Sequence, residues 1–370
     1  MTVQTEQARS GHPFRMWDAI METPDFVERC LQPDLAEPAK KVGREIVERG
    51  INRVFLLGCG SSFYAASSAA RAFQTLAGLD ADAYDSFEFH KYRLGFVTPK
   101  TAVISFSHSG ATRETVDVAR EVRKRGAFTV SVTDRPESLL ADSADFFVNV
   151  GGGREPVEPK TRSVVSTFVM GYLMAIGALP KERQDQLDEE LKRIPAALRS
   201  AQGLEARAKE LAEKYSGVKR VLAVGNGQNY VTAMEIALKF KEAVLLAGEG
   251  LETEEAFHGP IASLNDSTLV IATSCPGPSY QKTKDYCVAA SMIGCRVLSV
   301  SPEPYDLPGV DKLEVPMDGI SEVFSNSVLV YPQYMLAYYS ALVRGNMPDA
   351  FRIGDKAFHA AMAAVPPLTY

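Results

Sequence analysis

The sequence predicts an α/β protein built from two doubly wound, parallel-sheet subdomains in tandem. The first observation behind this prediction is an internal repeat, in which RVFLLGCGSSFYAA is matched by RVLAVGNGQNYVTA and TAVISFSHSG by TLVIATSCPG. The matched segments begin at Arg53 and Arg220, at Thr101 and Thr268, and at Gly126 and Gly294, with offsets of 167, 167 and 168 residues. Three collinear matches at nearly constant spacing indicate two halves of similar structure.

The second observation is the alternation of apolar strands with helical segments inside each half. VFLLG, AVISFS and FTVSVTD are continuous apolar runs typical of buried strands. RETVDVAREVRKRG has Val116, Ala119 and Val122 at helical spacing and ends at Gly126, so it predicts an amphipathic helix. Continuous apolar strands that alternate with helices predict a parallel sheet covered on both faces.

The elements are expected in the following order along the chain. An N-terminal helical segment is expected over 1–45, the first subdomain over 46–185, a connecting helix pair over 186–210, the second subdomain over 211–345 and a tail over 346–370. The apolar stretch from Val164 to Leu179 is too short for the roughly 20 residues that cross a bilayer. It therefore predicts a buried helix.

Composition and charge exclude several classes of function. The chain has 370 residues with 40 basic and 46 acidic side chains, a net charge of −6, which lacks the basic footprint of a nucleic-acid binder. None of the five cysteines forms a C-x-x-C pair, so neither a metal site nor a disulfide framework is predicted, and no cofactor is expected. The N-terminus has no apolar core typical of a signal peptide. We expect a cytoplasmic protein without membrane contact.

Two loops of the first half follow predicted strands and precede predicted helices. They are Gly58–Ser62 and the hydroxyl-rich Ser107–Thr112. Ligands of parallel sheets bind at the carboxyl ends of strands, and N–H groups at a helix N-terminus attract anions. The alternative is that Ser109 and Thr112 only cap the helix. The matching second-half loop, Thr273–Pro278, has two prolines and fewer donors, which predicts one phosphate site per chain.

A second group of polar residues lies in the second half. Glu235, Lys239 and Glu242 are spaced i, i+4, i+7 and share one face of a predicted helix. His258-Gly259-Pro260 follows an acidic stretch, GEGLETEEAF, which we expect to be a loop. The plain interpretation is a solvated salt-bridge stripe and a turn histidine. Together, however, carboxylates, a lysine and an imidazole suffice for proton transfer next to a carbonyl.

These motifs resemble the sugar isomerase (SIS) family. The sequences GCGSS, SFEFHKYR, SHSGATRET, EPVEPKTRS, EIALKFKEA and FHGP occur in this order. They are most similar to the tandem-SIS enzymes, namely the isomerase half of glucosamine-fructose-6-phosphate aminotransferase and the fructosamine 6-phosphate deglycases. The resemblance implies two flavodoxin-like subdomains, in agreement with the repeat.

The resemblance also implies roles for individual residues. Phosphate contacts are implied for Ser62, Ser107, His108, Ser109 and Thr112, beside the substrate loop residues Gly60 and Ser61; His108 stands where the aminotransferase pattern has Gln. Glu242 matches the base that moves a proton between C1 and C2, with Glu235 and Lys239 beside it. His258 matches a histidine linked to ring opening that reaches the site from a second subunit, so a homodimer is implied.

Two departures from the aminotransferase pattern favour a deglycase or deaminase. No N-terminal cysteine nucleophile is present, so hydrolysis of glutamine is not expected, and neither Lys356 nor His359 aligns with the carbonyl-binding lysine of that family's tail. The segment NMPDAFR instead resembles the end of the deglycases. A plain aldose–ketose isomerase and a non-catalytic phosphosugar sensor remain alternatives.

Overall fold

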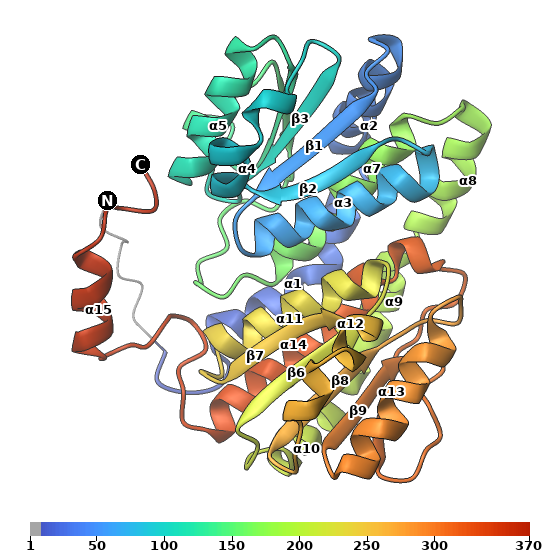
Figure 1. The fold of residues 1–370 in the computed structure, drawn as a ribbon, viewed down its shortest axis with the longest axis vertical. Helices are drawn as coiled ribbons and strands as arrows, with labels where there is room; N and C mark the ends of the chain where they lie inside the picture. Colours follow the sequence, from blue (N-terminus) through green and yellow to red (C-terminus); the bar gives the residue numbers. More distant parts are fainter. Residues whose placement is uncertain (1–8) are drawn as a thin grey trace.

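The computed structural model describes residues 9–370 and contains two five-stranded sheets in which all strands are parallel (Figure 1). The first sheet has the order β2-β1-β3-β4-β5. The second has the order β10-β9-β8-β6-β7, which is the same order when each strand is replaced by its repeat equivalent. The predicted fold class, two doubly wound subdomains in tandem, is therefore confirmed.

The first half begins with two helices and continues as strand–helix units. Its elements are α1 (Arg15–Cys30), α2 (Pro33–Glu48), β1 (Arg53–Gly58), α3 (Ser61–Ala77), β2 (Ala81–Asp85), α4 (Ser86–Tyr92), β3 (Thr101–Phe106), α5 (Arg113–Lys124), β4 (Phe128–Thr133), α6 (Leu139–Asp142), β5 (Phe146–Asn149) and α7 (Arg162–Gly177). Residues 1–8 of the predicted N-terminal segment lie outside the described residues.

The second half repeats this plan after a helical connection. Its elements are α8 (Lys181–Leu191), α9 (Ile194–Ala201), α10 (Glu205–Lys214), β6 (Arg220–Gly225), α11 (Gln228–Glu242), β7 (Ala247–Glu252), α12 (Thr253–Phe257), β8 (Thr268–Thr273), α13 (Tyr280–Ile293), β9 (Arg296–Ser301), β10 (Val310–Glu314), α14 (Asn326–Val343) and α15 (Lys356–Ala363). Short 3₁₀ turns complete both halves.

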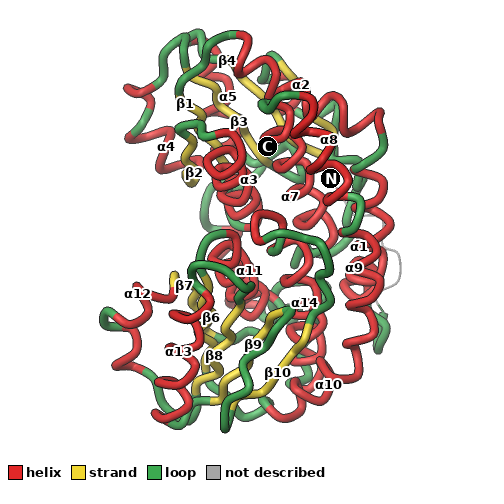
Figure 2. Tube along the Cα trace, turned by 90° about the vertical axis from the view of Figure 1, so that its right-hand side faces the viewer, coloured by secondary structure: helices red, strands yellow, loops and turns green. Residues whose placement is uncertain are grey.

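A layer of helices joins the two sheets. Helices α3 and α7 of the first half and α11 and α14 of the second lie between the sheets, with α3 packed against α11 (Figure 2). The apolar stretch predicted as a buried helix is α7, in which 15 of its 16 residues are buried. Ser68 and Gln228 exchange two hydrogen bonds of 3.1 Å across this layer, which satisfies polar groups that burial would otherwise leave without partners.

Two expectations about individual elements were wrong. The connection between the halves has three α-helices, α8, α9 and α10, where a helix pair was expected. The stretch GEGLETEEAF is not a loop, because Ala247–Glu252 forms strand β7 and Thr253–Phe257 forms α12. Both glycines of β7 let the strand lie directly against α11, since a Cβ at Gly248 or Gly250 would lie within 2.7 Å of the α11 backbone.

Within residues 9–370, none of the helices combines the length and apolar character needed to cross a bilayer.

The crossing of α2 and α7 yields the first testable prediction. A Cβ added at Gly177 would overlap the backbone of Lys40, because the two helices touch there. We expect Gly177→Ala to lower the free energy of unfolding by roughly 1–3 kcal/mol or more, the usual cost of overpacking. Urea denaturation measures this, with Gly203→Ala as control because nothing lies within 4 Å of its added Cβ. Equal stability of the two variants would contradict the packing argument.

Candidate active site

The Gly-x-Gly turns that follow β1 and β6 are the same structure built twice. At Gly58 and Gly225 an added Cβ would collide with the backbone of the following helix, so only glycine fits. Gly60 and Gly227 have φ values of 57° and 54°, a left-handed conformation that glycine adopts without cost. This Gly-x-Gly turn places Ser61 and Ser62 at the N-terminus of α3.

The hydroxyl-rich loop after β3 gathers the predicted phosphate contacts. Ser107 Oγ lies 2.9 Å from Thr112 Oγ1 and 3.4 Å from Ser109 Oγ. Thr112 is the N-cap residue of α5, yet no side chain caps this helix, so the capping alternative is wrong for Thr112. Ser109 Oγ instead accepts a hydrogen bond of 3.2 Å from the N–H of Ala111. Three hydroxyls therefore converge at one helix N-terminus.

His108 lies beside this loop and is fixed by a buried carboxylate. Its Nδ1 donates to Asp134 Oδ2 at 2.9 Å, and Asp134 has no exposed side-chain surface. The N–H of Gly152 donates to the other oxygen of Asp134 at 2.6 Å, and the N–H of Glu155 donates to His108 Nε2 at 3.5 Å. Both ring nitrogens of His108 therefore have hydrogen-bond partners.

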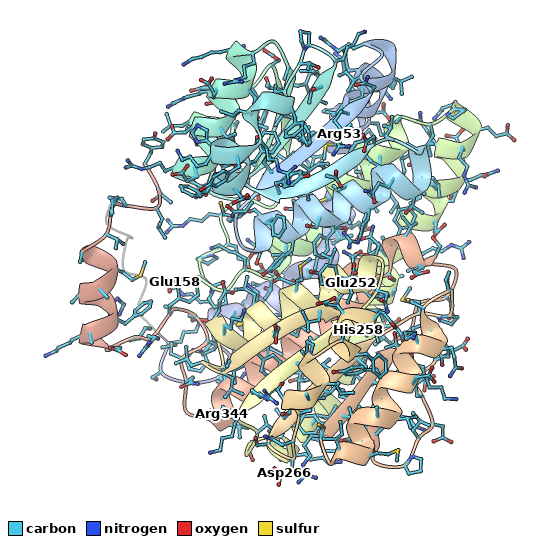
Figure 3. All side chains as sticks on the ribbon, viewed as in Figure 1. Arg53, Glu158, Glu252, His258, Asp266 and Arg344 are labelled. Carbon is cyan, nitrogen blue, oxygen red and sulfur yellow. The ribbon has the colours of Figure 1, made fainter. Side chains whose placement is uncertain are left out.

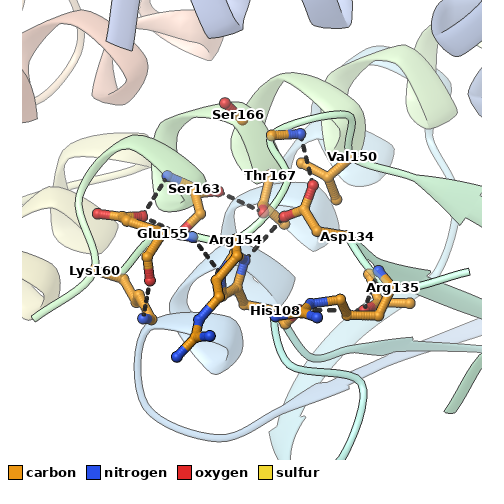
Figure 4. Close-up of polar contacts among 12 residues, drawn as sticks. His108, Asp134, Arg135, Val150, Arg154, Glu155, Lys160, Ser163, Ser166 and Thr167 are labelled. Carbon is orange, nitrogen blue, oxygen red and sulfur yellow. Dashed lines mark hydrogen bonds and ion pairs between the residues drawn. The ribbon is translucent and has the colours of Figure 1, made fainter. Parts of the chain in front are cut away.

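The segment between β5 and α7 contacts His108 and Asp134 (Figure 4). Glu155 is buried and accepts hydrogen bonds from the N–H and hydroxyl groups of both Thr161 and Ser163. Burial alone would raise the pKa of Glu155, but these hydrogen bonds hold it below its ordinary value. A small, mostly apolar cavity lies beside the segment and is lined by Ser61, Ser62, Ala65, His108, Lys160, Ser163, Val164 and Thr167.

The predicted Glu–Lys–Glu face of α11 is a buried ion cluster. Lys239 has no exposed side-chain surface, pairs with Glu242, and lies 3.4 Å from Glu235 Oε1. Its Nζ also donates to Ser61 Oγ of the first half at 3.3 Å, which joins the cluster to the Gly-x-Gly turn. Burial acts to lower the pKa of Lys239, but the two carboxylates raise it above its ordinary value. The interpretation as a solvated stripe is therefore wrong.

Glu235 differs from Glu242 in its surroundings. Glu235 is fully buried and accepts from the Tyr334 hydroxyl at 3.1 Å, while its second oxygen has no partner. Burial raises the pKa of Glu235 to about 7, against the opposing effect of Lys239. Glu242, by contrast, has a side chain that is 18% exposed and so can meet a ligand.

The second-half counterpart of the hydroxyl loop has its polar groups occupied. Tyr305 OH donates to Ser274 Oγ at 2.8 Å, and Gln333 Nε2 donates to Thr273 Oγ1 at 3.1 Å. Both Thr273 and Ser274 are buried. Donors for an anion therefore gather in the first-half loop, which supports the prediction of one phosphate site per chain.

His258 does not join the ion cluster within the described chain. Its imidazole is 70% exposed and lies 3.2 Å from Glu254 Oε1, at the end of α12 (Figure 3). No hydrogen bond or ion pair links it to Glu235, Lys239 or Glu242 in the part of the chain that the structure describes. One protomer by itself therefore leaves the predicted ring-opening group outside the site.

The C-terminal region forms hydrogen bonds to the segments that surround the site. Asp349 of the NMPDAFR segment accepts from the N–H groups of Arg15 and Met16 and so caps α1. Its carbonyl also accepts from the N–H of Glu158 at 2.9 Å, in the segment above the cavity. Helix α15, which contains Lys356 and His359, has no buried residue and stands away from the sheets (Figure 1).

The last residues return from α15 to the hydroxyl loop. The N–H of Arg113 donates to Leu368 O at 3.0 Å, and the N–H of Tyr370 donates to Ala111 O at 3.0 Å. Tyr370 OH also donates to Asp117 Oδ1 at 2.6 Å, and the Arg113 guanidinium lies over the Tyr370 ring. The tail thus occupies one of the first N–H groups of α5.

Sequence reasoning missed Asp134, Glu155, Lys160 and Tyr334 as members of the site. EPVEPKTRS was noted as a motif, but nothing in its pattern indicated that Glu155 orders the segment or that Lys160 faces the cavity. Asp134 directly follows β4, and a polar residue at the carboxyl end of a buried strand is a signal that could have found it. Residues 9–370 contain no group of three or more His, Cys, Asp or Glu side chains suited to hold a metal.

Comparisons with known proteins identify sequences that are similar to this chain. Residues 49–177 match the SIS domain family. Glutamine–fructose-6-phosphate aminotransferase (isomerizing) of Thermococcus kodakarensis is 28% identical over 347 residues, which are 92% of this chain and 57% of the relative. The chain spans between 50% and 57% of the length of three such curated relatives.

Solved structures share the whole fold. The C-terminal domain of glucosamine-fructose-6-phosphate aminotransferase from Francisella tularensis superposes with a TM-score of 0.85 at 22% identity, over 93% of this chain and 100% of that one. Glucosamine-6-phosphate deaminase from Thermotoga maritima gives a TM-score of 0.71 at 22% identity, over 92% and 98% of the two chains. These likenesses show a common fold.

The raised pKa of Glu235 predicts a pH-dependent stability. A carboxyl group whose pKa is raised by folding favours the folded state while protonated, and this contribution is lost as the pH rises through about 7. Glu235→Gln removes this titration, so the variant should gain stability relative to the unaltered chain between about pH 5 and about pH 8. Urea denaturation of both chains at the two pH values measures the change. A stability difference that stays constant with pH would contradict the raised pKa.

The contact between the C-terminal residues and the hydroxyl loop predicts that one backbone amide is protected from hydrogen exchange. Deleting residues 367–370 removes Leu368 O, the acceptor of the Arg113 N–H, so hydrogen exchange at Arg113 should become faster by at least about tenfold. The amide of Val116 donates to Thr112 O and serves as the internal control. Unchanged exchange at Arg113 would show that the tail leaves the loop in solution.

Proposed function

Since residues 49–177 belong to the SIS domain family and the whole chain resembles the isomerase part of glucosamine-fructose-6-phosphate aminotransferase, we propose that it is a phosphosugar isomerase-type enzyme. The proposed substrate is a ketosamine or aminosugar 6-phosphate, and the most favoured activity is that of a deglycase or deaminase. The observation that carries the proposal is the buried Glu235–Lys239–Glu242 cluster, joined through Ser61 to the first half.

The phosphate site is proposed at the N-termini of α3 and α5. Ser62, Ser107, Ser109 and Thr112 would donate hydroxyl hydrogen bonds to the phosphate oxygens, with helix N–H groups beside them. His108 lines the same cavity, and Gly60 and Ser61 form the loop under the sugar. Both turns lie at carboxyl ends of neighbouring strands, β1 and β3, so a single phosphosugar can contact both.

Glu242 is the proposed base of the reaction. It would remove a proton from C1 of the open-chain ketosamine while the C2 carbonyl oxygen takes a proton from solvent, giving an enolamine with a double bond between C1 and C2 and a hydroxyl on C2. Return of the proton to C2 yields an imine at C1, and attack of water on the imine releases the amine and an aldose 6-phosphate. Lys239 pairs with the Glu242 carboxylate and holds it in position. The fully buried Glu235 is the second carboxylate beside the Lys239 ammonium.

His258 is proposed to act in the site of a second copy. Its exposed imidazole lies at the surface at the end of α12, so a partner subunit could receive it. This supports a homodimer in which each histidine assists ring opening across the interface. The dimer, like the cytoplasmic location, remains a prediction.

Glu242→Gln tests the role of the base. The variant should lose at least about 10²-fold in kcat, the lower range for removal of a general base, while phosphosugar binding stays within a few-fold. Glu189→Gln, an exposed carboxylate on α8, is the matched control and should keep full activity. Near-normal turnover by Glu242→Gln would remove it from the base role.

A panel of 6-phosphates separates the candidate reactions. Purified protein is given fructosamine 6-phosphate adducts, glucosamine 6-phosphate, glucose 6-phosphate and fructose 6-phosphate, with released amine and aldose phosphate measured separately. Amine release is expected. Ketose–aldose exchange alone would establish the plain isomerase, and saturable binding without turnover would establish the phosphosugar sensor.

A further inference from the structure

Lys160 is a cation beside the small cavity described above, and the proposed reaction does not use it. It lies in the segment between strand β5 and helix α7 (Figure 4). Its side chain lines the cavity together with Ser62 and His108, two of the residues proposed to meet the phosphate. Lys160 therefore lies at the same cavity as two of the residues proposed to bind the phosphate.

The positive charge of Lys160 has no carboxylate partner. The ammonium donates to the main-chain carbonyl oxygens of Glu155, at 2.9 Å, and Val157, which leaves its third N–H free. In the described part of the chain no carboxylate lies within ion-pair distance of it, and the nearby Glu155 carboxylate is occupied by Thr161 and Ser163. Burial lowers the pKa of Lys160, the Glu155 carboxylate beyond ion-pair distance acts to raise it, and Lys239 and Arg154 act to lower it further.

The other groups around the cavity leave a phosphate without a counter-charge. The hydroxyls of Ser62, Ser107, Ser109 and Thr112 are neutral. His108 is already paired through its Nδ1 with the buried carboxylate of Asp134. Lys239 is surrounded by Glu235 and Glu242, so its charge is already balanced.

We propose that Lys160 is the charged anchor of the substrate phosphate, a role that rests on the proposed function. Its free N–H would form a charge-assisted hydrogen bond to a phosphate oxygen, while its two bonds to main-chain carbonyls keep the ammonium aimed at the cavity. The segment from Gly151 to Thr161 thus becomes part of the phosphate site. Lys160 would make the enzyme select phosphorylated over unphosphorylated sugars.

The test measures binding without turnover. Glucitol 6-phosphate, which has no carbonyl group, and inorganic phosphate are titrated by calorimetry into the full chain and into Lys160→Met, Lys160→Gln and Lys160→Arg. Loss of one hydrogen bond to a charged group corresponds to roughly 10- to 100-fold in affinity, so Lys160→Met and Lys160→Gln should weaken the binding of both ligands by that factor. Lys160→Arg should bind both ligands within about threefold of the unaltered chain, because it keeps the charge and donors that bind phosphate.

The controls separate the charge from the order of the segment. Lys160→Gln retains N–H donors for the carbonyls of Glu155 and Val157 but removes the charge, whereas Lys160→Arg keeps the charge. Lys181→Met removes an exposed lysine on α8 and should bind both ligands as the unaltered chain does. A loss of affinity in Lys160→Arg as large as that in Lys160→Met would show that Lys160 only orders the segment, and would overturn the proposal.

Kinetics give a second and independent outcome. The proposal expects KM to rise while kcat stays within a few-fold, because the phosphate is bound equally in the ground state and the transition state. A fall in kcat with unchanged binding of glucitol 6-phosphate would place Lys160 at the reacting carbons and overturn the proposal. The binding assay needs no turnover. Failure of the Lys160 proposal can therefore be distinguished from failure of the proposed catalytic role, which the Glu242→Gln variant tests.

Discussion

The buried charge of Lys239 is the constraint on which the site depends. An ammonium without solvent contact is stable inside a protein only where carboxylates and hydrogen-bond acceptors surround it. Glu235 and Glu242 supply these one turn before and after it on α11, and Ser61 supplies an acceptor from the other half. Because the acceptors come from both halves, the ion cluster fixes α3 against α11, and with them the two Gly-x-Gly turns. Burial keeps one carboxyl, Glu235, with a pKa of about 7, while Glu242 remains accessible.

The two halves have the same scaffold but contribute different groups to the site. Both sheets have the same strand order, and both Gly-x-Gly turns use glycine for the same steric reasons. The first half leaves the hydroxyls of Ser107, Ser109 and Thr112 grouped at a helix N-terminus, whereas the second half buries Thr273 and Ser274 under Tyr305 and Gln333. The second half instead supplies α11 with its charged face. A single composite site arises because α3 and α11 pack together.

The segment between β5 and α7 and the C-terminal region complete the site without belonging to either sheet. Glu155 binds the start of α7 through four hydrogen bonds, and this carboxylate gives the segment its shape. Asp349 connects the same segment to the start of α1, and the last residues pair with the hydroxyl loop. Parts of the chain that are far apart in sequence thus converge on the proposed phosphate, which explains why single motifs describe it incompletely.

The sequence by itself determined the tandem parallel-sheet fold, the buried helix α7, the hydroxyl loop and the shared face of Glu235, Lys239 and Glu242. These follow from periodicity and repetition, which are properties of a continuous segment. Only the tertiary structure decided that this face is buried, that His108 is held by Asp134, that Lys160 faces the cavity, and that a glycine-rich acidic stretch forms strand β7. Burial and pairing depend on which elements pack together, and the residues involved are distant in the chain, so no local pattern records them.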